Sequence, residues 1–102
     1  MSAHSSWHFI QRVTERIGPH VSATALARGI VGSVRAADGA VEFVARVDRD
    51  GCRLFRFRVP DDGRYFYALV DTEKWVCVTV MPPGFVAGRV GKSRLKLKDV
   101  DL

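Results

Sequence analysis

The sequence predicts an α+β fold in which two N-terminal helices pack on a four-stranded antiparallel meander sheet. Apolar residues recur at helical spacing up to about residue 36, and from about residue 40 they alternate with a period of two. The 102 residues suffice for one hydrophobic core but not for two. We therefore expect a single domain over 1–102, helical over 5–36 and antiparallel sheet over 40–81, followed over 82–102 by a basic C-terminal tail or short fifth strand.

The first helix is expected over residues 5–17. Ser5 or Ser6 can act as its N-cap, and Gly18-Pro19 ends it because proline cannot continue a helix. Its apolar stripe comprises Trp7, Ile10, Val13 and Ile17, with Phe9 beside them. The opposite, polar side carries His8, Gln11, Arg12, Glu15 and Arg16.

The second helix is expected over residues 23–36, with Ser22 as its N-cap. Gly29 and Gly32 lie inside it, and each lowers the stability of a helix by roughly 1 kcal/mol relative to alanine. Two interior glycines indicate that this helix either packs closely against a neighbour or is partly irregular.

Four strands are expected after Asp38-Gly39, over residues 40–47, 52–59, 64–70 and 74–81. Asp50-Gly51 and Pro60-Asp61-Asp62-Gly63 have the composition of tight turns, because glycine accepts positive φ angles. Such short turns require antiparallel neighbours. The alternation places on one face of the first strand Val41, Phe43, Ala45 and Val47.

Charge is the first indication of function. Sixteen Lys and Arg side chains outnumber eleven Asp and Glu, which leaves a net charge of +5. Twelve of the sixteen cations are arginine, which binds phosphate groups bidentately and stacks on bases. These features favour RNA or another polyanion as a partner. Codon usage in a GC-rich genome would enrich arginine in the same way, without any bearing on function.

Several classes of function find no motif in the sequence. Cys52 and Cys77 belong to no Cys-x-x-Cys pair, and three histidines offer no zinc spacing, so no metal or other cofactor is expected. Both thiols are predicted to be small buried residues in a reducing compartment, unless their strands are neighbours and they pair. We see no secretory signal and no apolar run of about 18 residues, so a cytoplasmic location without membrane contact is expected.

One candidate catalytic cluster lies on the first helix. His8, Arg12 and Arg16 are spaced at i, i+4 and i+8, which places them on one side of the helix. An imidazole can act as a general base or acid, and guanidinium groups stabilise negative charge that develops on a scissile phosphate. This chemistry suits a ribonuclease that uses no metal. The same three residues would also form an ordinary solvated polar face.

Two further groups of cations are candidate nucleic-acid contacts. On the sheet, the face without helices is expected to hold Arg46, Arg56 and Arg58, with Tyr65 or Tyr67 beside them. In the C-terminal segment, alternate cations would share one face of an extended chain, namely Lys92, Arg94, Lys96 and Lys98. The arginines on the sheet could equally serve solubility, because charged residues usually point outward from a one-sided sheet. The cations of the C-terminal segment could equally protect an edge strand against aggregation.

The order of elements, together with the string Trp7-His8-Phe9-x2-Arg12-Val13-x2-Arg16, resembles the RelE/ParE-type toxin ribonucleases, within the wider group of small barnase-, colicin- and RelE-like nucleases. The resemblance covers residues 7–81. It implies a metal-free RNA-cleaving site formed by His8, Arg12 and a sheet arginine, Arg56 or Arg58. The last strand departs from that pattern, because it offers Trp75 and Thr79 where those enzymes have a C-terminal tyrosine.

Three functions follow as alternatives. The first is a small, toxin-like ribonuclease that acts on RNA phosphodiesters with His8, Arg12 and Arg56 as catalytic residues. The second is a non-catalytic nucleic-acid-binding module that uses the same cations. The expected nucleic-acid contacts are Arg16, Arg46, Arg58, Tyr65, Lys92, Arg94, Lys96 and Lys98. The third is a phage or mobile-element accessory protein that inhibits a host protein machine by binding it. An antitoxin or a host target is the protein partner that the first and third alternatives imply.

Overall fold

The computed structural model describes residues 4–60, 63–83 and 94–95 of the chain. Its elements are α1 (Trp7–Arg16), α2 (Ala23–Ala36), β1 (Glu42–Val47), β2 (Cys52–Arg58), β3 (Tyr65–Asp71), β4 (Val76–Met81) and β5 (Arg94–Leu95). The strand order is β4-β3-β2-β1-β5, in which the first four strands are antiparallel neighbours and β5 is parallel to β1. The predicted α+β fold with a four-stranded meander is therefore confirmed, and a short fifth strand joins its edge.

Both helices begin at a serine that the sequence predicts as a cap. Ser6 Oγ accepts a hydrogen bond from Phe9 N–H at 3.0 Å, and Ser22 Oγ accepts one from Ala25 N–H at 3.3 Å. Such caps satisfy backbone donors in the first turn that have no partner within the helix. The end of α1 is followed by Gly18, whose φ of 143° is rarely adopted by residues with a side chain.

The interior glycines of α2 have a different setting from the one predicted. The helix is continuous through Gly29 and Gly32, and a Cβ atom added at either position would meet nothing within 4 Å. Both glycines therefore lie on an open side of α2, and neither close packing nor irregularity accompanies them. Burial of the opposite side, which includes Ala27, Ile30 and Val31, compensates for the weak intrinsic propensity.

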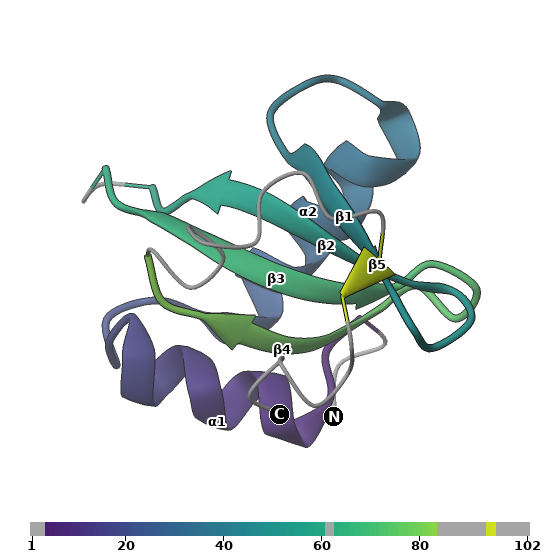
Figure 1. Ribbon diagram of the computed structural model, residues 1–102. Coiled ribbons are helices and arrows are strands. Elements are labelled where there is room, and N and C mark those ends of the chain that lie inside the picture. Colours follow the sequence, from purple (N-terminus) through teal and green to yellow (C-terminus); the bar gives the residue numbers. More distant parts are fainter. Residues whose placement is uncertain (1–3, 61–62, 84–93, 96–102) are drawn as a thin grey trace.

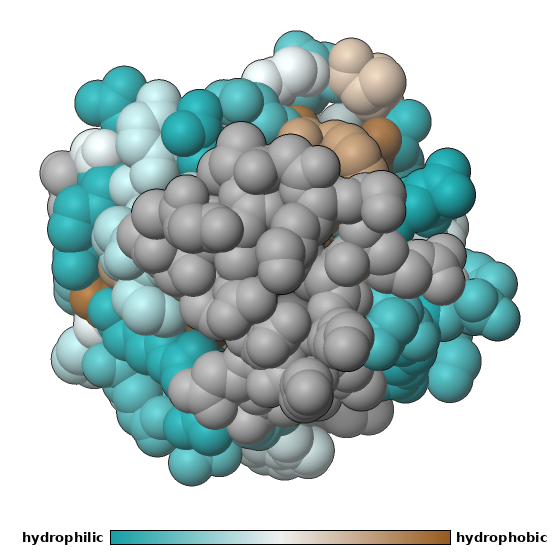
Figure 2. Space-filling view, in the orientation of Figure 1, coloured by the Kyte–Doolittle hydropathy of each residue, from teal (hydrophilic) through white to brown (hydrophobic). Residues whose placement is uncertain are grey.

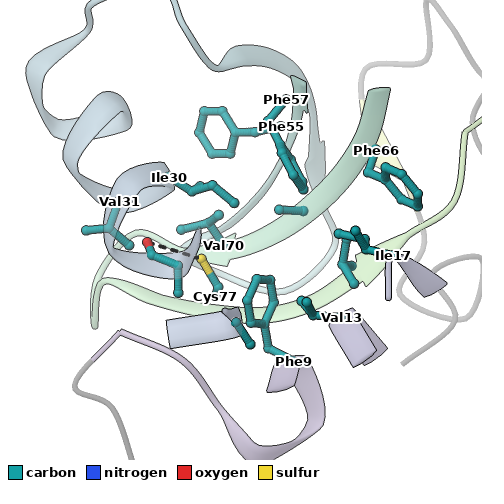
Figure 3. Close-up of a cluster of buried hydrophobic side chains, with 14 of the residues drawn as sticks. Phe9, Val13, Ile17, Ile30, Val31, Phe55, Phe57, Phe66, Val70 and Cys77 are labelled. Carbon is teal, nitrogen blue, oxygen red and sulfur yellow. Dashed lines mark hydrogen bonds between the residues drawn. The ribbon is translucent and has the colours of Figure 1, made fainter. Parts of the chain in front are cut away.

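The helices cover one side of the sheet, the helix-covered face. In Figure 1, α2 lies behind the sheet and α1 runs along β4. Figure 3 shows side chains of both helices meeting side chains of β2, β3 and β4 in one apolar cluster. Its labelled members are each at most 6 % exposed: Phe9, Val13, Ile17, Ile30, Val31, Phe55, Phe57, Phe66, Val70 and Cys77. Removal of this surface from water is the main driving force for packing the helices on the sheet.

The opposite side of the sheet, the second face, holds a smaller apolar cluster. Its buried members are Ala45, Val47, Cys52, Leu54, Leu69 and Met81, each at most 7 % exposed. The sequence predicts an arginine-rich surface here. Instead, the centre of the second face is apolar and buried, and the arginines occupy only part of it.

A β-bulge in β1 changes the direction of the side chains along that strand. Phe43 pairs with Phe55, but the next pair is Ala45 with Leu54, so one extra residue lies between the two pairs on β1. An extra residue reverses the alternation of faces beyond it. Phe43 therefore lies with Phe55 on the helix-covered face, whereas Ala45 lies with Leu54 on the second face, and the prediction that Phe43 and Ala45 share a face is wrong.

The same bulge relocates Arg46. Its partner on β2 is Arg53, which lies two residues from Phe55 and hence on the helix-covered side of the sheet. Arg56 and Arg58 alternate with Phe55 and point to the second face. The prediction that Arg46 shares a face with these two arginines is therefore wrong.

The two cysteines are free and buried on opposite sides of the sheet. Cys77 belongs to the cluster of the helix-covered face, and Cys52 belongs to the cluster of the second face. The Cys77 thiol lies 3.9 Å from the Ala27 carbonyl oxygen, to which it donates a weak hydrogen bond (Figure 3). The prediction of small buried thiols is confirmed, and their positions exclude a bond between them.

Candidate nucleic-acid interface

The predicted catalytic stripe of α1 lies against the edge strand β4. Arg16 Nη1 donates a hydrogen bond to the Val80 carbonyl oxygen at 2.6 Å, and Arg12 Nη1 forms an ion pair with Glu15 at 2.6 Å. His8 is half-buried, and its Nε2 atom is buried without a hydrogen-bond partner among the described residues. This stripe is therefore a packed flank of the helix, in which Arg16 satisfies a carbonyl group at the sheet edge.

Backbone pairing ahead of α1 sets the rotation of the helix. Cys77 N–H donates to the His4 carbonyl at 2.8 Å, and Ser6 N–H donates to the Cys77 carbonyl at 3.1 Å. Ser6 Oγ also donates to the Val78 carbonyl at 2.9 Å. These bonds hold the start of α1 beside β4 and cover polar groups of an edge strand that would otherwise be open to pairing.

The rotation of α1 determines which of its apolar side chains are buried. Phe9 and Val13 are fully buried, whereas the side chain of Trp7 is 71 % exposed. The prediction that Trp7 belongs to the buried stripe is wrong, and Phe9 occupies the central position instead. The reason is that the buried stripe comprises Phe9, Val13 and Ile17 at i, i+4 and i+8, and Trp7, two residues before Phe9, lies on the other side of the helix.

Four residues of β2 and β3 form an arginine–tyrosine patch on the second face: Arg56, Arg58, Tyr65 and Tyr67. The antiparallel register pairs Arg56 with Tyr67 and Arg58 with Tyr65. The Arg56 Cζ atom lies 4.7 Å from the centroid of the Tyr65 ring, which is a cation–π distance. Tyr65 is 44 % exposed, and most of the described residues visible in Figure 2, which faces this side of the sheet, are hydrophilic.

Glu42 holds the central guanidinium of the patch in place. Arg56 Nη2 and Glu42 Oε1 are 2.8 Å apart, and the two residues are partners across β1 and β2. The hydrogen bond to Glu42 is the main cause that raises the pKa of Arg56, so the group stays a cation. The two side chains are 38 % and 56 % exposed, which leaves the guanidinium accessible to a ligand and its ion pair weak.

Glu42 has no place in the predicted site. Its position opposite Arg56 follows from the hairpin register only when the bulge in β1 is counted, and no residue pattern announces that bulge.

A second group of arginines lines a polar hollow of about 280 Å³ at the turn between β1 and β2. Arg46, Arg49 and Arg53 contribute to it, together with the acidic Asp50 and Glu73. Direct opposition of Arg46 and Arg53 is unfavourable, because like charges on paired strands repel. Arg49 lies in the turn and had no place in the predicted site, because strand alternation assigns no face to a turn residue.

The Arg53 side chain is held in this hollow by the neighbouring turn. Its Nη1 donates to Thr72 Oγ1 at 2.7 Å, and Thr72 Oγ1 donates to the Gly51 carbonyl at 2.8 Å. The Arg53 guanidinium is therefore held in place in a hollow at the turn between β1 and β2, which residues of both faces line, Val47 and Cys52 of the second face among them.

The predicted catalytic residues do not form one site among the described contacts. His8 and Arg12 lie on α1 beside β4, whereas Arg56 lies on β2 and is separated from β4 by β3. Arg94 opens β5 as the register partner of Arg46. The remaining predicted contacts lie outside the described residues, namely Lys92, Lys96 and Lys98.

The chain matches no protein-family model, no curated protein and no solved structure. Within residues 4–60, 63–83 and 94–95, no group of three or more His, Cys, Asp or Glu side chains could hold a metal ion. In the same part of the chain, no helix is long and apolar enough to cross a membrane. Fold and surface together define the class: a small α+β domain whose sheet carries a cationic, aromatic patch.

Proposed function

We propose that the protein binds single-stranded RNA without cleaving it, and that the arginine–tyrosine patch is the contact surface. The observation that carries this proposal is the guanidinium of Arg56, whose Cζ atom lies 4.7 Å from the centroid of the exposed Tyr65 ring on the paired strand. A base can stack on the tyrosine ring while the adjacent guanidinium contacts a phosphate group.

The energetics of such a surface suit a flexible strand. Stacking of one base on an aromatic side chain contributes roughly 1–3 kcal/mol, and it is tolerant of sequence because every base has a π-face. Phosphate contacts from Arg56 and Arg58 add binding free energy through the release of counterions from the RNA. This contribution decreases as the salt concentration rises. The net charge of +5 favours encounter with a polyanion.

Cleavage is less well supported than binding. The predicted general base, His8, is half-buried on the flank of α1, and Arg56 lies two strands away from β4. A general base must come within hydrogen-bond reach of the proton that it takes from the substrate. Membership of the RelE/ParE-type toxin ribonucleases and the cytoplasmic location stay predictions of the sequence.

The test is a titration of a fluorescently labelled single-stranded RNA of mixed sequence, read by anisotropy in EDTA at several salt concentrations. Tyr65→Ala and Arg56→Ala are each expected to weaken binding by about 5- to 100-fold, the range set by loss of one stacking or phosphate contact. Arg28→Ala is the matched control, because Arg28 is exposed on α2 and its removal changes the net charge equally.

Equal weakening in Arg28→Ala and Arg56→Ala would show that only net charge matters and would exclude the patch as the site. Absence of binding by the wild-type protein at low salt would overturn the proposal and favour a protein partner. The same samples run on a denaturing gel test for chemistry. Cleavage by the wild type that is lost in His8→Ala would establish the ribonuclease in place of the binding module.

A further inference from the structure

A larger hollow lies on the helix side of the molecule, between α2, the residues just ahead of β1 and the end of β2. Of its described lining residues, only Arg58 belongs to the arginine–tyrosine patch. The volume of the hollow is about 440 Å³. Sites for small molecules typically have volumes of roughly 300–1,000 Å³ and mainly apolar linings. Two buried core residues, Ile30 and Phe57, contribute to the lining, with the partly buried Leu26 and Val41 beside them.

Small residues on α2 keep this groove open. Ala25, Gly29 and Ser33 all line it and are spaced at i, i+4 and i+8, so they share one side of the helix. A Cβ atom added at Gly29 would meet nothing within 4 Å. The apolar wall of the groove is therefore accessible because the facing helix residues are too small to fill it.

Among the described residues, those that line the groove include the cation Arg58 and no acidic side chain, and His20 is a further exposed residue at its border. The acidic Asp38 lies beside the groove, where its carboxylate accepts hydrogen bonds from Ser33 Oγ and Ala40 N–H at 3.3 and 2.9 Å. An apolar body in the groove would cover Ile30 and Phe57, and a negative group on the same molecule would be attracted by Arg58. The volume suits a small molecule rather than a protein segment.

We propose that this groove binds a small apolar molecule that carries one negative charge, such as an aliphatic or aromatic carboxylate or sulfonate. The apolar body displaces water from the floor of the groove, which supplies most of the affinity. The anionic group selects such ligands over neutral ones through Arg58. The groove itself does not depend on RNA binding, because Gly29, whose substitution tests it, lies on α2 and outside the arginine–tyrosine patch. Arg58 belongs to both the groove and the patch, so its substitution tests only the selection for an anion.

The test uses 8-anilinonaphthalene-1-sulfonate, an apolar anion whose fluorescence rises on binding, with neutral N-phenyl-1-naphthylamine as its uncharged counterpart. Gly29→Leu places a side chain in the groove and is expected to weaken binding of both dyes at least tenfold. Gly32→Leu is the matched control, because Gly32 has the same open space but does not line the groove. Arg58→Gln is expected to weaken binding of the sulfonate by about 5- to 10-fold and to leave the neutral dye unchanged.

Each variant is checked for a sharp, cooperative thermal transition, because the sulfonate dye also binds loosely packed chains. If Gly29→Leu fails this check, Ala25→Leu fills the same groove from a second exposed position. No binding to the folded wild type, or equal loss in Gly29→Leu and Gly32→Leu, would overturn the site. Equal binding of the sulfonate by wild type and Arg58→Gln would overturn the selection for an anion.

Discussion

The helix-covered face and the second face of the sheet both bury apolar side chains, but different elements supply those side chains. On the helix-covered face, Phe9 of α1 and Ile30 of α2 reach the strands, so helices and sheet share one cluster. On the second face, the described buried residues come from strands only, and the arginine–tyrosine patch adjoins them. Alternation identifies the residues that share a face of a strand without a bulge, such as β2, but it does not tell how much of that face is core and how much is surface.

The largest expected effects test whether both faces are core at their centres. Phe57→Ala on the helix-covered face is expected to lower the free energy of unfolding by about 3–5 kcal/mol, and Leu54→Ala on the second face by about 2–5 kcal/mol, because each leaves a cavity. Urea unfolding followed by circular dichroism measures both values. A cost below about 1 kcal/mol for Leu54→Ala would mean that the second face is surface throughout, and the comparison would fail.

The two buried cysteines, one on each face, make the free energy of unfolding depend on pH. Burial raises the pKa of Cys77 to about 12, and burial is also the main cause that raises the pKa of Cys52 above its ordinary value near 9. A folded protein that holds the proton more tightly than the unfolded chain loses stability as the pH rises above the unfolded pKa. For Cys77 this loss extends from about pH 9 to about pH 12, at up to about 1.4 kcal/mol per pH unit.

Urea unfolding near pH 8 and near pH 10.5 checks this expectation. Cys77→Ala should lose less stability than the wild type between the two pH values, whereas Cys52→Ala should resemble the wild type more closely. Identical losses in the wild type and Cys77→Ala would show that the Cys77 thiol is not protected by the helix-covered face.

A smaller effect is expected at the edge of that face, where α1 meets β4. Arg16→Ala removes a charged donor from the Val80 carbonyl and is expected to cost about 1–3 kcal/mol of stability. Arg28→Ala removes the same charge from the exposed side of α2 and should change stability by less than about 0.5 kcal/mol. Thermal unfolding of the two variants at the same salt concentration distinguishes them. Equal melting temperatures would assign Arg16 to the surface rather than to the attachment of α1.

The smallest effect concerns the open side of α2. Gly32→Ala is expected to stabilise the protein by roughly 0.5–1 kcal/mol, because Gly32 has helical backbone angles and free space for a methyl group. Gly39→Ala is the contrasting control, since its φ of 83° disfavours any residue with a Cβ atom and the substitution should destabilise. The urea concentration at the midpoint of unfolding measures both changes in stability. If Gly32→Ala destabilises the protein, the space beside Gly32 is not free, and the prediction is wrong.

Much of the fold could be predicted because local signals agree with one another. Ser6 and Ser22 cap the helices, and Gly51 and Gly63 have the positive φ angles that their turns require. The candidate site was only partly predictable. Arg58 and Tyr65 do face one another across β2 and β3, as the alternation indicates, whereas the partner of Arg56 depends on a register that the bulge alters.

By itself, the sequence determined the order of the elements, their approximate bounds, the antiparallel meander and the alternation of arginine with phenylalanine in β2. These follow from periodicity, caps and turn chemistry, which act between residues close together in the chain. Only the tertiary structure decided that Trp7 is exposed while Phe9 is buried, that Arg46 lies across the sheet from Arg56, and that the second face has an apolar centre. Each of these depends on contacts between residues far apart in the chain, such as those of His4 with Cys77 and of β1 with β2. Local sequence patterns do not predict such contacts. A helix that rotates, or a strand that shifts by one residue, keeps nearly the same interactions between residues close together in the chain.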